Sequence, residues 1–273
     1  MTPRDFRSLA TGLTATAMVL NGCGNLDDRR FDHPQIRELQ QESVSRFPGR
    51  PIRGESITDF FSDKVGLIEG AHPQIPSGRA IPVGKDGYYL TAWHVVSGGD
   101  YHLSDLVILR PPPKNGTFNT TDYLRWDSYP GRLVWHDEKA DLAIVKFDHR
   151  PAIVFTPTAT PATKGTAVFS GASGRNSGTL LSSSTSAAGI GNGPFATAGT
   201  VTRVRPGPLP SHDSTLVGRG GMSGAPVVDE SGGLAGVVTS VHSHLFSTPT
   251  TRFSMIPPRE LDRILTADRA ANR

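Results

Sequence analysis

The sequence predicts an all-β fold followed by one C-terminal helix. Glycine and proline account for 30 and 22 of the 273 residues, and both residue types favour turns over the interior of a helix. Short apolar runs bounded by such turns recur along the chain, as is typical of β-rich domains. The last segment, 258–271, differs because Leu261, Ile264 and Leu265 have helical spacing with charged residues between them. It therefore predicts a closing amphipathic helix.

The expected strands fall into two halves, at about 56–155 and 165–257, joined by a Pro/Thr-rich connection. In the first half, residues 79–91 predict a β-hairpin with Lys85-Asp86-Gly87 as its turn. Its second strand leads directly to a histidine. The other strands are expected at 65–68, 106–109, 131–135, 141–147, 167–170, 200–204, 233–241 and 252–256. Residues 170–198 are expected to form a loop or a long irregular hairpin beside the active site, and residues 205–214 a loop.

The N-terminal residues 1–22 predict a secretory signal. Two arginines give a positive start, and the apolar run that follows is too short for a stable transmembrane anchor. Cys23 follows Leu20-Asn21-Gly22 and so resembles the lipidated residue of a bacterial lipobox. We therefore expect lipidation of Cys23, a tether over 23–55, and an exported, membrane-anchored lipoprotein in the cell envelope or periplasm. The alternative is an ordinary signal peptide and a secreted protein.

Charge, cysteine content and histidine spacing argue against nucleic-acid binding, an internal disulfide and a metal site. The formal net charge is +3, and the basic residues form no stripe with interleaved aromatics, so we expect no nucleic-acid partner. The single cysteine excludes a disulfide within the chain. His242 and His244 alternate along an expected strand, but two ligands alone make a weak metal site. We therefore expect no metal and no cofactor.

Three short stretches carry residues suited to acyl transfer. Ser223 lies among four glycines within 218–228, where a hydroxyl can be exposed and backbone N–H groups can converge on one point. His94 follows an apolar strand, and Asp141 opens another. Each alone has an ordinary explanation, as a turn serine, a core histidine and a turn aspartate. Together, in the order His, Asp, Ser, they favour a catalytic triad.

These motifs resemble those of bacterial trypsin-like serine proteases of the HtrA-like and glutamyl-endopeptidase-like branches. The similarity covers about 56–258. It is carried by 87–96 around the histidine, 140–143 around the aspartate and 221–227 around the serine. The resemblance implies two six-stranded antiparallel β-barrels of the chymotrypsin type and a protease domain over 56–272.

The resemblance also implies a serine endopeptidase that acts on a polypeptide substrate. In such an enzyme His94 is the general base and then the general acid, Asp141 orients the histidine ring, and Ser223 is the nucleophile. The backbone N–H groups of Gly221 and Ser223 would form the oxyanion hole. His136-Asp137-Glu138, just before the aspartate motif, is expected to be a simple polar turn.

The residues that resemble a specificity pocket carry no acidic group. Val217 stands where trypsin has an acid, and Val238 where glutamyl endopeptidases have a histidine, so we expect a small or medium apolar substrate side chain. The hydroxyl of Thr239 is expected to approach Asp141. Met222 replaces the aspartate that pairs with a freed N-terminus in trypsin-like zymogens, so activation by N-terminal insertion is not expected. The full set of predicted pocket residues is Val217, Val238, Thr239, Ser240 and Val241.

Two alternatives compete with this interpretation. The first is a catalytically silent surface lipoprotein that uses the protease fold as a binding module. The second is an α/β-hydrolase, in which the serine leads into a helix and the histidine comes last. Here the apolar run 225–228 continues as a strand and the histidine comes first, which disfavours the hydrolase.

Overall fold

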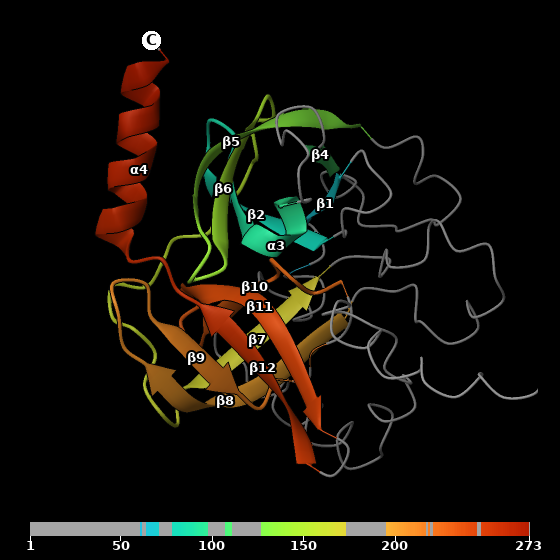
Figure 1. Cartoon of the computed structure of the whole chain (residues 1–273), viewed down its shortest axis with the longest axis vertical. Helices are drawn as coiled ribbons and strands as arrows, with labels where there is room; N and C mark the ends of the chain where they lie inside the picture. Colours follow the sequence, from blue (N-terminus) through green and yellow to red (C-terminus); the bar gives the residue numbers. More distant parts are fainter. Residues whose placement is uncertain are drawn as a thin grey trace, which may run out of the picture.

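The computed structural model describes most of the region expected to be globular. Its strands form two closed six-stranded antiparallel β-barrels, and one long helix follows the second barrel (Figure 1). The predicted all-β fold of two barrels and a C-terminal helix is therefore confirmed. The predicted signal, the tether with Cys23, and Val217 lie outside the described residues. The structure describes Phe61, 64–70, 78–97, 107–110, 127–172, 195–216, Gly218, 221–244 and 247–272.

The first barrel contains the predicted hairpin. Its turn is closed by the Gly87 N–H, which donates to the Gly84 carbonyl at 3.0 Å. Gly87 has a φ of 93°, and a Cβ there would collide with the carbonyl oxygen of Phe147, so the turn requires glycine. The strands, in barrel order, are β1 (Gly66–Gly70), β2 (Gly78–Gly84), β3 (Tyr88–Ala92), β6 (Leu142–Phe147), β5 (Tyr129–Asp137) and β4 (Val107–Arg110).

The second barrel contains a strand that the sequence pattern did not predict. Ser211–Ser214 was expected to lie in a loop, but it pairs with a strand on each side, and His212 and Ser214 face the interior. Its four polar residues carry no apolar alternation, so the pairing is decided by non-local contacts. The strands, in barrel order, are β10 (Pro226–Asp229), β11 (Leu234–His244), β12 (Ser247–Ser254), β9 (Ser211–Ser214), β8 (Phe195–Arg205) and β7 (Ala167–Ala172).

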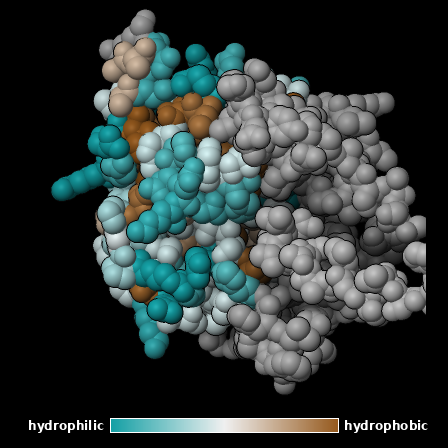
Figure 2. All heavy atoms as spheres, in the orientation of Figure 1, coloured by the Kyte–Doolittle hydropathy of each residue, from teal (hydrophilic) through white to brown (hydrophobic). Residues whose placement is uncertain are grey.

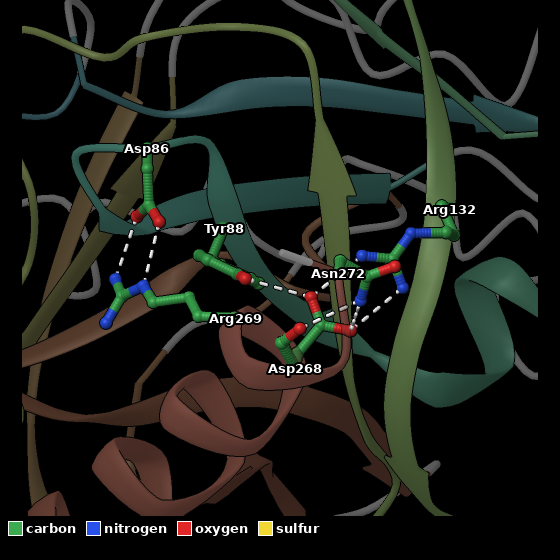
Figure 3. A network of polar contacts seen from close by, with 6 residues as sticks. All are labelled: Asp86, Tyr88, Arg132, Asp268, Arg269 and Asn272. Carbon is green, nitrogen blue, oxygen red and sulfur yellow. Dashed lines mark hydrogen bonds and ion pairs between the residues drawn. The ribbon is translucent and has the colours of Figure 1, made fainter.

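Helix α4 (Pro258–Ala271) follows the second barrel in sequence but lies beside the first, next to β5 and β6 (Figure 1). The buried side chains of Leu261, Ile264 and Leu265 belong to a core cluster that contains residues of both barrels. The helix thus lies against the hydrophobic junction between the barrels. Its last turns carry polar contacts to the first barrel (Figure 3).

Most hydrophobic side chains of the described region are used in the cores. Figure 2 shows one face of the molecule, on which hydrophobic residues form separate patches among hydrophilic ones. Among the described residues, Ile153 is the large hydrophobic residue that is exposed, at 44%. No helix in this part of the chain has the length and apolar composition needed to cross a bilayer.

Candidate active site

The three residues of the predicted triad come from separate elements and meet between the barrels. His94 lies in α3 (Trp93–Val96), a single helical turn after β3, and Asp141 ends the turn between β5 and β6. Ser223 lies in the turn before β10. His94 Nδ1 is 2.7 Å from Asp141 Oδ2, and His94 Nε2 is 2.8 Å from Ser223 Oγ. The structure therefore brings the three side chains into one continuous hydrogen-bonded line.

The carboxylate of Asp141 fixes which ring nitrogen of a neutral His94 carries the proton. An ionised carboxylate only accepts hydrogen bonds, so Nδ1–H donates to it and Nε2 accepts the Ser223 O–H. The second oxygen of Asp141 accepts the His94 backbone N–H at 2.9 Å. Both carboxylate oxygens are thus occupied by one residue. The His94 and Asp141 side chains remain 37% and 27% exposed, so the line is accessible from solvent.

The serine turn is held between the two barrels by backbone contacts. The Arg79 N–H of β2 donates to the Ser223 carbonyl at 2.7 Å, and the Gly224 N–H donates to the Val238 carbonyl of β11 at 2.7 Å. Gly221 and Gly224 have φ values of 81° and 83°, a region that favours glycine. A Cβ on Gly224 would collide with the Arg79 carbonyl. The glycines are therefore needed for the turn to sit this close to β2.

A profile of the family described as the trypsin-like peptidase domain matches residues 78–237. The chain belongs to this family. The crystal structure of the Rv3671c protease from M. tuberculosis in its active form shows a similar fold, with 19% identity and a TM-score of 0.52, and the match covers 80% of this chain and 86% of that one. The apo MamO protease domain from Magnetospirillum magneticum matches at 17% identity and a TM-score of 0.50, covering 74% and 95% of the two chains. No curated protein sequence matches significantly.

Two of the predicted pocket residues of this trypsin-like peptidase are buried in the second barrel. Val238 is fully buried in the core of the second barrel. Thr239 is also buried, but its hydroxyl donates to the Arg252 carbonyl at 3.4 Å rather than to Asp141. The β11–β12 register shifts between Val238 and Ser240, so Thr239 is an extra residue in a bulge. A bulge redirects side chains locally, which accounts for the hydroxyl bonding to Arg252 instead of Asp141.

The remaining predicted positions lie along β11. Ser240 Oγ is 3.0 Å from His242 Nε2. Val241 is partly buried against the core of the second barrel and lies close to Gly218. Within the described residues there is no cluster of three or more His, Cys, Asp or Glu side chains that could hold a metal ion.

Sequence reasoning missed several residues that support this peptidase's site. Arg79 acts through its backbone, whose N–H donates to the Ser223 carbonyl, and the side-chain hydroxyl of Thr91 donates to the Arg79 carbonyl at 2.7 Å and thereby braces this strand. No sequence pattern marks that role. Asp137 accepts the backbone N–H of Ala140 at 2.7 Å. An aspartate that opens a four-residue turn is a recognised signal, and could have identified this contact.

Proposed function

We propose that the chain is a serine endopeptidase of the HtrA-like or glutamyl-endopeptidase-like bacterial branches, which hydrolyses peptide bonds through an acyl-enzyme. The observation that carries this proposal is the hydrogen-bonded line from Asp141 through His94 to Ser223. A serine hydroxyl is a weak nucleophile until a base removes its proton. His94 Nε2 lies within the distance needed for that transfer.

The same groups account for both halves of the reaction. Ser223 Oγ attacks the carbonyl carbon of the substrate peptide while its proton passes to His94 Nε2. Asp141 stabilises the imidazolium that forms. The imidazolium then gives the proton to the departing amine, and the C–N bond breaks to leave an ester on Ser223. A water molecule then attacks the carbonyl carbon of the ester while its proton passes to His94 Nε2. His94 returns that proton to Ser223 Oγ as the ester C–O bond breaks, so a carboxylic acid is released and the serine is regenerated.

The developing negative charge needs donors on the other side of the carbonyl. We assign this role to the backbone N–H groups of Gly221 and Ser223, because the left-handed conformation at Gly221 lets this peptide turn toward the nucleophile. One such donor typically contributes about 2.7–4 kcal/mol to the transition state. Neither donor requires a side chain.

The substrate side chain next to the scissile bond is proposed to be small or medium and apolar. Val217, Ser240 and Val241 bring no charge to the predicted pocket, so cleavage after lysine or arginine is disfavoured. We also propose that the enzyme is exported and held to a membrane by a lipid on Cys23. Residues 23–55 would then set its reach from the bilayer.

A fluorophosphonate probe tests the catalytic proposal without knowledge of the substrate, because it reacts with a serine that a neighbouring base has activated. We expect the wild-type protein to be labelled at Ser223 and to cleave casein, and Ser223→Ala to do neither. The variant should retain its melting temperature, since it loses one oxygen atom. Absence of labelling in folded wild-type protein would favour a silent binding module instead.

A further inference from the structure

Asp141 has an unusual backbone conformation for its residue type. Its φ is 54°, and among the described residues it is the one residue other than glycine with a positive φ. This left-handed conformation is unfavourable for residues with a Cβ, although aspartate tolerates it better than most. Such a conformation persists where surrounding contacts impose it. The contacts around the turn 138–141 therefore determine where the carboxylate points.

Asp137 supplies the stronger of two hydrogen bonds that close this turn. Its carboxylate accepts the Ala140 N–H at 2.7 Å, whereas the Asp141 N–H donates to the Glu138 carbonyl at a longer 3.3 Å. Asp137 is the last residue of β5, and it pairs with Leu142 of β6. Its side chain thus bridges the turn from one strand to the residue immediately before Asp141.

His136 supports the same turn from the other direction. Its ring stacks on Trp93, with ring centres 3.9 Å apart and planes 15° from parallel. The Trp93 N–H donates to the Asp141 carbonyl at 3.1 Å. The stack therefore holds Trp93, whose N–H binds the Asp141 carbonyl. The next residue, His94, donates its own N–H to the Asp141 carboxylate.

We propose that Asp137 and His136 are positioning residues for the pair formed by Asp141 and His94. They hold Asp141 in its left-handed conformation, so that its two carboxylate oxygens face the backbone N–H and the ring Nδ1 of His94. The catalytic consequence rests on the proposed function. If the turn loosens, fewer molecules present the carboxylate to the ring, and the imidazolium that forms during the reaction loses stabilisation.

Two variant pairs test the two contacts separately. Asp137→Ala removes the acceptor for Ala140, whereas Asp137→Asn keeps an amide oxygen at the same place. His136→Ala removes the stacked ring, whereas His136→Phe keeps one. Asp148→Ala is the charge-matched control, because Asp148 is exposed just beyond the other end of β6. The readout is the second-order rate of labelling by a fluorophosphonate, normalised to folded protein by circular dichroism.

We expect Asp137→Ala to lower the labelling rate about tenfold, the equivalent of one hydrogen bond of ordinary strength. His136→Ala should lower it about fivefold, as loss of an aromatic pair would. The Asn, Phe and Asp148→Ala variants should stay within about threefold of wild type. Equal rates in Asp137→Ala and wild type, or equal losses in the Ala and Asn variants, would overturn the assignment.

The pH profile separates positioning from a general loss of stability. With the imidazolium less stabilised, the acid limb of the labelling rate should move to lower pH in Asp137→Ala and His136→Ala, but not in their conservative partners. Asp137 and His136 together are called the clamp, and the titratable groups beside them are Glu138 and Lys139 in the turn, Asp141 and His94. Each variant changes a single titratable group. Lower rates with an unmoved acid limb would show a merely structural role.

Failure of this proposal can be told apart from failure of the proposed function. If folded wild-type protein is not labelled, the endopeptidase proposal fails, and the clamp is tested by the NMR titration of the His94 ring. A titration midpoint that moves to lower pH in Asp137→Ala, but not in Asp137→Asn, supports the clamp. Identical midpoints in all three proteins refute it.

Discussion

His94 Nε2 lies 2.8 Å from Ser223 Oγ, although the histidine belongs to the first barrel and the serine to the second. The geometry of this pair therefore depends on how firmly the two barrels are held together. One connection lies beside the serine itself, where the Arg79 N–H donates to the Ser223 carbonyl. A second is helix α4, which contacts the first barrel at its C-terminal end (Figure 3).

The contact between the serine turn and β2 predicts that Gly224→Ala is severely destabilising. The new Cβ would meet the Arg79 carbonyl and lie 2.6 Å from the Thr91 hydroxyl, in addition to the strain of a left-handed alanine. We expect a loss of about 3 kcal/mol or more in the free energy of unfolding, since steric overlap in a packed site adds to the backbone cost. Urea denaturation measures the loss of stability, and fluorophosphonate labelling measures whether Ser223 is still reactive.

Gly232→Ala is the matched control. Gly232 has a similar φ of 80°, but nothing lies within 4 Å of the position its Cβ would occupy. Gly232→Ala should therefore lower the free energy of unfolding only by the cost of the left-handed backbone, about 1–2 kcal/mol, and its Ser223 should remain fully labelled. Similar losses in the two variants would show that the contact with Arg79 has no special importance.

The contacts of α4 predict unequal effects for its two ion pairs. Asp268 accepts two hydrogen bonds from Arg132 and one from the Tyr88 hydroxyl, and its side chain is 11% exposed. Asp86 pairs with Arg269 at 45% exposure. We expect Asp268→Ala to lower the free energy of unfolding by about 1–2 kcal/mol, because the buried Tyr88 hydroxyl loses its acceptor, whereas the exposed Arg132 can bind water instead. Asp86→Ala should cost less than about 1 kcal/mol.

The pH dependence of the Asp268 contacts has a defined sign. The hydrogen bonds from Arg132 hold the pKa of Asp268 below its ordinary value of 3.8, and burial together with Asp268 raises the pKa of Tyr88 to about 12. A lowered carboxylate pKa gives stability that is complete above the ordinary value and is lost as pH falls through the lowered one. Unfolding curves of wild type and Asp268→Ala should converge only below about pH 4. Convergence at higher pH would contradict this account.

The lipoprotein proposal predicts that Cys23→Ser changes location and leaves catalysis intact. A thioether-linked lipid cannot form on serine, so the protein should leave the membrane fraction or remain unprocessed. Fractionation followed by mass spectrometry of the mature N-terminus measures both outcomes. Labelling of Ser223 should be unchanged, because the anchor takes no part in the reaction. An unmodified Cys23 in the wild-type mature protein would remove the anchor from the proposal.

Local patterns in the sequence were sufficient for some features and not for others. The Lys85-Asp86-Gly87 turn and the helix 258–271 were predicted because their signals lie within a few residues. β9 was missed because its pairing depends on two strands distant in sequence. The left-handed Asp141 was missed because its conformation is imposed by contacts with other elements. The Thr239 hydroxyl, in a bulge of β11, bonds to the Arg252 carbonyl instead of Asp141, and no spacing rule would show that bulge.

β9 also carries a buried histidine that predicts acid sensitivity. His212 is fully buried and stacks on Phe253, with ring centres 4.7 Å apart. Its Nε2 is 3.1 Å from the Ala162 carbonyl in the connection between the barrels, and its Nδ1 has no hydrogen-bond partner among the described residues. In its neutral form the ring donates through Nε2–H to the Ala162 carbonyl. A proton added at Nδ1 would be a buried charge without an acceptor.

Burial lowers the pKa of His212 below its ordinary value of 6.5. Because the folded state resists protonation, stability should fall as pH drops below 6.5, by up to about 1.4 kcal/mol per pH unit, until the lowered pKa is reached. His212→Gln keeps an N–H donor but cannot titrate, so its stability should change less between pH 7 and pH 5 than that of wild type. His149→Gln is the comparison variant for the same measurement, because burial also lowers the pKa of His149, which is less buried than His212. If urea denaturation gives wild type and His212→Gln the same pH dependence, the acid sensitivity has another source.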